Sequence, residues 1–112
     1  MKIQIKKSET GFDLVELEGE LDFHSSPDVR NELAKLVERQ ALKVMVDLKG
    51  VNYIDSSGLA TFVELFQKMK RYSGTLVLFN LNQGVRSVFE IAKLDTIFKL
   101  AASQKEALSL IA

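Results

Sequence analysis

The sequence predicts an α/β fold, with a mixed β-sheet of about four to five strands and about four helices packed on it. Two strand patterns come first, helical and strand patterns then alternate, and residues 42–48 are nearly all apolar. A strand pair followed by alternating helices and strands is typical of parallel crossover units joined to an antiparallel pair. No repeat or linker interrupts this order, so we expect one domain over residues 1–112.

The first two strands form a predicted hairpin. Ile3 and Ile5 alternate with polar residues, a turn follows over residues 8–11, and apolar residues return from Phe12 to Leu17. Alternation on both sides of a short polar segment containing glycine is typical of two paired strands.

The first helix is predicted to begin at Ser26 and to end near Gln40. Serine is a good helix N-cap, and the Pro27 that follows is favoured at the first helical position. Apolar residues then recur at helical spacing: Val29, Leu33, Leu36 and Val37.

The next strand is predicted to lie near the centre of the sheet. Residues 42–48 read Leu-Lys-Val-Met-Val-Asp-Leu, a pattern typical of a strand that is covered on both faces. Asp47 and Gly50 are expected to mark its end.

The remaining elements follow the same alternation. A second helix is expected from about Leu59, a buried strand over 75–79, a third helix after the turn over 80–84, and a short strand around 97–100. Ser103 and Glu106 have the spacing of a capping box, which predicts a terminal helix. Five phenylalanines are expected in the core: Phe62, Phe66, Phe79, Phe89 and Phe98.

The composition disfavours several classes of function. Lys and Arg number 15, as do Asp and Glu, so no bulk charge gathers nucleic acid or an anionic membrane surface. There is no cysteine, which excludes disulfides, thiolate metal sites and cysteine nucleophiles. No stretch resembles a signal peptide or a membrane span, so we expect a cytoplasmic protein.

The most informative segment is Tyr53-Ile54-Asp55-Ser56-Ser57-Gly58-Leu59-Ala60, between the central strand and the second helix. Asp55 or Ser56 can cap the helix, and Gly58 permits close approach to the turn. A capped helix start by itself accounts for this composition. A functional interpretation also fits, because an exposed serine hydroxyl in the first turn could accept a phosphate beside Asp55, and the added charge would repel a partner.

This segment, preceded by Val46-Asp47-Leu48, resembles the signature of anti-sigma factor antagonists with a STAS domain. The resemblance extends over nearly the whole chain. It includes Leu17-Glu18-Gly19-Glu20-Leu21-Asp22, Gly74-Thr75-Leu76-Val77-Leu78, Val85-Arg86-Ser87-Val88-Phe89 and Leu94-Asp95-Thr96-Ile97-Phe98, the last of these being similar to the family's final strand.

The resemblance implies a partner switch rather than an enzyme. The unphosphorylated protein, a monomer when free, would bind an anti-sigma factor that is also a serine kinase, and so release a sigma factor. Phosphorylation of Ser57 would end binding, and a PP2C-type serine phosphatase would reset the switch. The partner-binding residues implied are Asp22, Asp55, Ser56, Ser57 and Gly58. No cofactor is implied, because ATP and magnesium belong to the kinase.

Other interpretations of these residues are weaker. Asp22, His24 and Ser57 could form a hydrolase triad, but the Gly-x-Ser-x-Gly elbow is missing. Asp47 follows a strand as in a response-regulator receiver, without the paired acids that hold magnesium. With one histidine and no cysteine, no metal site is expected. The serious alternative is a STAS subunit of a transport complex or of another signalling complex.

Overall fold

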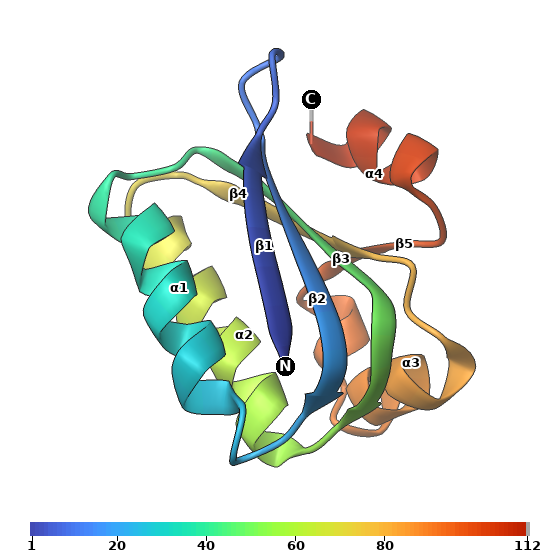
Figure 1. Cartoon of the computed structure of the whole chain (residues 1–112). Coiled ribbons are helices and arrows are strands. Elements are labelled where there is room, and N and C mark those ends of the chain that lie inside the picture. Colours follow the sequence, from blue (N-terminus) through green and yellow to red (C-terminus); the bar gives the residue numbers. More distant parts are fainter. Residues whose placement is uncertain (112) are drawn as a thin grey trace.

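The structure, a computed structural model, describes residues 1–111 as a five-stranded mixed sheet with four α-helices, which confirms the expected fold class (Figure 1). The strands are β1 (Lys2–Lys7), β2 (Asp13–Leu21), β3 (Lys43–Ile54), β4 (Thr75–Phe79) and β5 (Lys99–Ala101). The helices are α1 (Ser26–Glu38), α2 (Ser56–Lys70), α3 (Gln83–Ile91) and α4 (Gln104–Ile111), with a short 3₁₀ turn η1 (Leu94–Thr96).

The strands lie in the order β1-β2-β3-β4-β5. β1 pairs antiparallel with β2, which confirms the predicted hairpin, and every later pair is parallel. When parallel strands are added in one direction through right-handed crossovers, the connecting helices all fall on one face. The buried side chains of α1, α2 and α3 accordingly share one apolar core with one face of the sheet.

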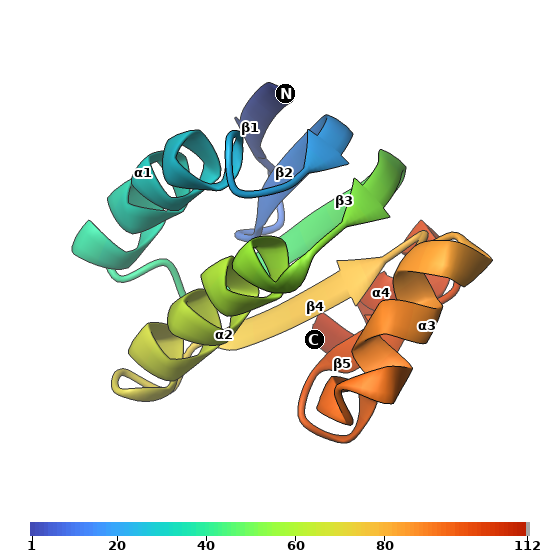
Figure 2. The same cartoon turned by 90° about the horizontal axis from the view of Figure 1, so that it is seen from below.

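The opposite face of the sheet is covered by α4, which Figure 1 shows on the other side of the strands from α1 and α2. Figure 2 shows α1 and α2 next to each other along the sheet. Ala107 and Ile111 of this helix pack with Met45, Val77 and Phe79 of the central strands. Because successive residues of a strand point to opposite faces, Val44 and Val46 enter the first core while Met45 enters the second. This double burial explains the apolar run at residues 42–48 and confirms the central position predicted for the strand.

The predicted end of this strand was wrong. β3 does not stop at Asp47 or Gly50 but continues to Ile54. The pairing with β2 shifts twice in this region, which places two bulges in β3 opposite the second half of β2. Gly50 lies at the first bulge, where a Cβ atom would come within 3.0 Å of the Leu17 carbonyl oxygen. Glycine and polar residues here mark a bend in the strand rather than its end.

The expected boundaries of α1 also needed correction. The N-cap is Ser25, and Ser26 is the first helical residue, whose hydroxyl donates to the Asp22 carbonyl oxygen over 2.6 Å. The helix ends at Glu38 rather than near Gln40, because the backbone of Gln40 turns to a positive φ of 52°.

The last strand, expected around 97–100, is present but is shifted to Lys99–Ala101. Residues 94–96 form the 3₁₀ turn, and β5 begins only at Lys99, so Leu94-Asp95-Thr96-Ile97-Phe98 is not a strand. Phe98 is nevertheless buried, and its ring lies edge-on to that of Phe89 with the centroids 5.8 Å apart. The apolar residues of the segment therefore reflect core packing rather than strand pairing. Of the five phenylalanines expected in the core, four are buried and Phe66 is partly buried.

The terminal helix begins as predicted. The Glu106 amide donates to the Ser103 hydroxyl over 3.2 Å, and the Glu106 carboxylate accepts from the Ala102 amide over 3.4 Å. In a standard capping box the glutamate carboxylate accepts from the amide of the N-cap residue, which here would be Ser103. In this helix the carboxylate accepts from the amide of the preceding residue, Ala102.

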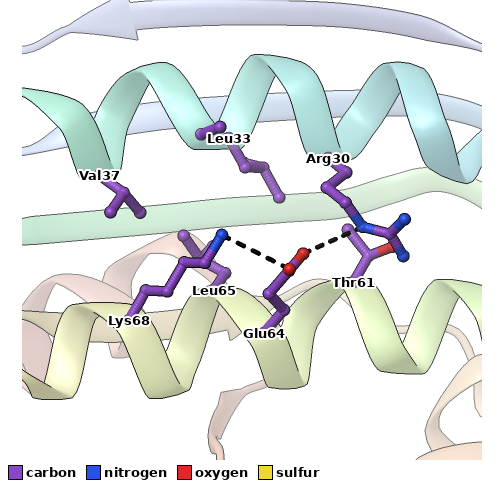
Figure 3. Close-up of a pocket in the computed structure, with 8 residues that line it drawn as sticks. Arg30, Leu33, Val37, Thr61, Glu64, Leu65 and Lys68 are labelled. Carbon is purple, nitrogen blue, oxygen red and sulfur yellow. Dashed lines mark ion pairs between the residues drawn. The ribbon is translucent and has the colours of Figure 1, made fainter.

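The groove between α1 and α2 is bridged by charged side chains. Glu64 of α2 accepts from Arg30 Nε of α1 over 3.0 Å, and its other oxygen lies 3.4 Å from Lys68 Nζ (Figure 3). Leu33 and Leu65 are buried in the core beneath these pairs. Since the charged groups are partly exposed, each pair contributes about 0.2–1 kcal/mol at most, and the apolar contact below them holds the helices together.

Candidate functional site

The segments singled out from the sequence meet at the carboxyl ends of the parallel strands. The loop over residues 22–25 leaves β2, Asp55 follows β3, and residues 80–82 follow β4. The carboxyl edge of parallel strands is where α/β folds collect their binding residues. Asn82 joins the segment after β4 to β3, since its side-chain amide donates to the Val51 carbonyl oxygen over 3.1 Å while its oxygen caps α3.

Asp55 is the N-cap of α2. Its Oδ1 accepts hydrogen bonds from the amides of Ser57, at 2.9 Å, and Gly58, at 3.2 Å. Of the two caps that the sequence allowed, the structure selects Asp55 over Ser56. The cap satisfies two amides that a helix start leaves without a partner, and its negative charge lies at the positive end of the helix dipole.

The other oxygen of Asp55 reaches a different segment. Oδ2 accepts from the backbone amide of Phe23 over 3.2 Å, and the Asp55 amide donates to the Leu21 carbonyl oxygen over the same distance. The start of α2 is thus hydrogen-bonded to the loop that follows β2. The structure therefore places the loop that contains Asp22 next to Asp55.

Asp22 organises that loop. Its Oδ1 accepts from the amides of His24, at 2.9 Å, and Ser25, at 3.1 Å. The Ser25 hydroxyl donates to the Glu20 carbonyl oxygen over 2.7 Å. The hydrogen bond from the Ser25 amide is the main cause that lowers the pKa of Asp22, burial opposes it, and the His24 amide adds to the lowering. Asp22 therefore stays ionised and holds a defined loop conformation.

The two serines of the turn differ in exposure. Ser56 is exposed, whereas Ser57, for which the sequence predicted an exposed hydroxyl, is partly buried. The Ser57 carbonyl oxygen accepts from the Thr61 hydroxyl over 2.9 Å. Within residues 1–111 the Ser57 hydroxyl forms no hydrogen bond, so it is available for chemistry at the first turn of α2.

Gly58 is buried below the turn. A Cβ atom at this position would lie 2.7 Å from Ile54 Cγ1, 2.8 Å from Leu21 Cγ and 2.9 Å from the Leu21 carbonyl oxygen. The absence of a side chain therefore lets the first turn of α2 lie directly on β2 and β3. Its expected part in partner binding stays a prediction.

The geometry of His24 does not match that of a catalytic base. Its backbone amide, rather than its ring, contacts Asp22, and its ring stacks on Phe23 with the centroids 4.1 Å apart. Asp47 has a structural role, because its Oδ1 accepts from the Lys49 amide and the Asn80 side chain. Residues 1–111 contain no cluster of three or more metal-ligating side chains.

Sequence reasoning missed Phe23. This residue is 65% exposed, and its amide is the point of contact with Asp55. A large apolar residue in an otherwise polar loop, directly after Asp22, was the available signal. The second missed residue is Asn82, for which no pattern indicated the contact with Val51.

Within the part of the chain that the structure describes, no helix has both the length and the apolar character needed to cross a bilayer.

Comparison with known proteins gives a consistent result. The sequence matches the STAS domain family over residues 4–107. It is 33% identical over 105 residues to the anti-sigma-B factor antagonist of Bacillus subtilis (strain 168), with 94% of each chain covered.

Two solved structures share the fold. An anti-sigma factor antagonist from Mycobacterium paratuberculosis superposes with a TM-score of 0.90 at 20% identity, covering 98% of this chain and 92% of that chain. The Bacillus cell fate determinant SpoIIAA in its phosphorylated form superposes with a TM-score of 0.76 at 20% identity, covering 99% and 100%.

Proposed function

Because this chain belongs to the STAS domain family, we propose that it is an anti-sigma factor antagonist whose binding is switched off by phosphorylation of Ser57. The similarity to the Bacillus subtilis antagonist, over 94% of both chains, supports the general function. The partner is an anti-sigma factor, and binding of this protein causes the anti-sigma factor to release a sigma factor.

The observation that carries the assignment of Ser57 is its position beside Asp55. Ser57 lies in the first turn of a 15-residue helix, its amide bonded to the Asp55 carboxylate, and its hydroxyl unbonded within residues 1–111. The hydroxyl oxygen can attack the γ-phosphorus of a kinase-bound ATP, with ADP as the leaving group and the proton passing to a base on the kinase. A PP2C-type serine phosphatase restores the hydroxyl by hydrolysis.

The added phosphate opposes binding through its charge. It carries about 1.5 to 2 negative charges at pH 7 and is placed beside the carboxylate of Asp55. Because the donor is ATP, the Ser57 hydroxyl must approach the nucleotide phosphates of the kinase. After transfer the phosphoserine faces the remaining phosphates of ADP, and this repulsion, together with the added volume, weakens the complex.

The surface around Ser57 supports a partner-binding role for its neighbours. Asp22 lies in the loop after β2, and Asp55 and Ser56 lie at the start of α2, all at the carboxyl edge of the sheet, while Gly58 supports the turn from below. A partner that contacts Ser57 would meet these residues in one surface.

The experiment compares four proteins: wild type, Ser57→Ala, Ser57→Asp and Ser56→Ala. Each is incubated with ATP and every anti-sigma factor of the source genome that carries a serine kinase domain, and phosphate is located by peptide mass spectrometry. We expect Ser57→Ala to bind without being phosphorylated, Ser57→Asp to bind weakly, and Ser56→Ala to behave as wild type. An unchanged phosphate content in Ser57→Ala would refute the site.

A second candidate function is that of a STAS subunit in a transport complex or another signalling complex. The observation that favours it is the exposure of large apolar side chains on α3 and on α4. Ile91 at the end of α3 is 82% exposed, and Leu108 and Leu110 of α4 are 39% and 36% exposed. If mass spectrometry of the protein from its own cells finds Ser57 unmodified under both growth and stress, this second function is favoured.

A further inference from the structure

Phe23 is an exposed aromatic residue on a rigid loop beside Ser57. Its exposed fraction is 65%, and its ring stacks on the ring of the neighbouring His24. Single exposed apolar residues are ordinary on protein surfaces, so exposure alone supports no role. A second observation is that hydrogen bonds connect the backbone of Phe23 through Asp55 to Ser57.

The backbone of Phe23 is held from two sides. Its own amide donates to Asp55 Oδ2, while the residues that follow it are fixed by Asp22 through the amides of His24 and Ser25. The loop is therefore ordered before any partner arrives. An aromatic side chain on an ordered backbone loses little conformational entropy on binding, which favours its use as an anchor.

The same carboxylate that holds Phe23 also holds Ser57. Asp55 Oδ2 contacts the Phe23 amide and Asp55 Oδ1 contacts the Ser57 amide, so one side chain holds the backbone of the aromatic residue next to the backbone of the phosphate acceptor. Ile91, Leu108 and Leu110, which are also exposed, lie on α3 and α4. Tyr53 is 51% exposed and lies on β3 two residues before Asp55, but within residues 1–111 the Asp55 carboxylate accepts from the amides of Phe23, Ser57 and Gly58 and not from Tyr53.

The local charge indicates the chemistry of the partner. Residues 20–28 and 51–58 contain four carboxylates, those of Glu20, Asp22, Asp28 and Asp55, and no lysine or arginine. The chain as a whole is neutral, so this surface is more acidic than the average of the protein. A complementary surface presents an apolar pocket with lysine or arginine at its rim.

We propose that Phe23 is the apolar anchor through which the unphosphorylated protein binds its anti-sigma factor, by inserting into an apolar pocket that basic side chains border. This assignment rests on the function proposed above, and Asp55 acts in it as a positioning residue. Aromatic residues that fill a desolvated pocket at the centre of an interface commonly dominate the binding energy, whereas their neighbours contribute little.

The test measures binding of the full chain to the purified anti-sigma factor kinases of the source genome by isothermal titration calorimetry, without ATP. Phe23→Ala is compared with Leu42→Ala, which removes a residue of similar exposure, 59%, located before β3 at the opposite edge of the sheet. We expect Phe23→Ala to raise the Kd about thirtyfold or more and Leu42→Ala to change it by less than about twofold. Phe23→Leu, which keeps an apolar side chain, should recover part of the loss.

The outcomes separate the two proposals. If wild type binds one of these kinases and Phe23→Ala binds it equally tightly, the anchor is wrong and the proposed function stands. If wild type binds none of them, the proposed function is wrong and the anchor is wrong with it. Thermal unfolding followed by circular dichroism should give equal Tm values for wild type, Phe23→Ala and Phe23→Leu, which shows that any loss of binding does not come from unfolding.

Discussion

Asp55 and Phe23, 32 residues apart in the sequence, are joined by a hydrogen bond of 3.2 Å from the Phe23 amide to the Asp55 carboxylate. Since the other oxygen of that carboxylate caps α2, the loop after β2 and the turn after β3 form one unit. Changes at Asp55 should therefore affect both the stability of α2 and the order of the Phe23 loop.

Replacement of Asp55 by alanine should lower the free energy of unfolding by about 1–2 kcal/mol, the usual cost of losing a helix N-cap. Ser56→Ala is the matched control, because Ser56 is exposed and Asp55, not Ser56, caps the helix. Urea denaturation of both variants measures the difference. Amide hydrogen exchange at Phe23 should be faster in Asp55→Ala only, and equal rates in both variants would contradict the connection.

Replacement of Gly58 by alanine should destabilise the protein by about 1–3 kcal/mol, as overpacking of a core does. The new methyl group would lie within 3.0 Å of Leu21 and Ile54. Gly84→Ala is the control, because a Cβ there comes no closer than 3.4 Å to the Asn82 side chain. Alanine is the better helix former, so Gly84→Ala should be neutral or stabilising by up to about 1 kcal/mol. Equal effects in the two denaturation curves would refute the close packing at Gly58.

The hydrogen bonds to Asp22 should make the protein less stable in acid. A carboxyl group whose pKa is lower in the folded state contributes stability above its unfolded pKa, and that contribution is lost as the pH falls through the folded pKa. The folded pKa of Asp22 lies below the ordinary 3.8 because of the Ser25 amide in the first place. Unfolding of wild type and Asp22→Asn, measured from pH 7 to pH 2, should therefore differ most above about pH 4 and converge below it. A constant difference at all pH values would show that the charge of Asp22 is not involved.

Tyr72 offers a test far from the site. Its hydroxyl oxygen is buried without a hydrogen-bond partner among residues 1–111, and this burial raises the pKa of Tyr72 above its ordinary value. Because no hydrogen bond is lost, Tyr72→Phe should leave the free energy of unfolding unchanged or raise it by up to about 1 kcal/mol. In an alkaline titration followed by phenolate absorbance, wild type should show an ionisation of Tyr72 at a pH above the ordinary pKa of tyrosine. This ionisation should be absent from Tyr72→Phe. A clear loss of stability would reveal a partner for the hydroxyl.

The apolar patterns of the sequence were sufficient to predict the class of fold. The run at residues 42–48 predicted a central strand because burial on both faces leaves a continuous apolar stretch. The patterns predicted where β3 begins, but not where β3 ends or the exact bounds of β5. Bulges and a 3₁₀ turn depend on contacts with residues that are distant in the sequence. One example is the close approach of Gly50 to Leu17, which a local sequence pattern cannot indicate.

For the candidate site, local chemistry predicted the cap but not the contact across the fold. Asp55 before a helix is a recognisable N-cap, because its partners lie two and three residues further along. The bond from Phe23 depends on how β2 and β3 are aligned, which only the folded sheet determines. Ser26 was chosen as the cap of α1 for its position before Pro27, and the structure gives that place to Ser25 because Ser26 instead bonds back to Asp22.

The bulges of β3 have a consequence for comparing sequences of this kind. Between the paired positions Glu16–Asp47 and Leu21–Ile54, β2 advances five residues while β3 advances seven. Because side chains alternate between the two faces of a strand, deleting a single residue from this stretch would turn every side chain up to Ile54 to the opposite face. A related protein could then retain every residue from Asp55 to Gly58 and still not form the turn between β3 and α2. The number of residues that separate the motif from Asp47 is thus as informative as the motif itself.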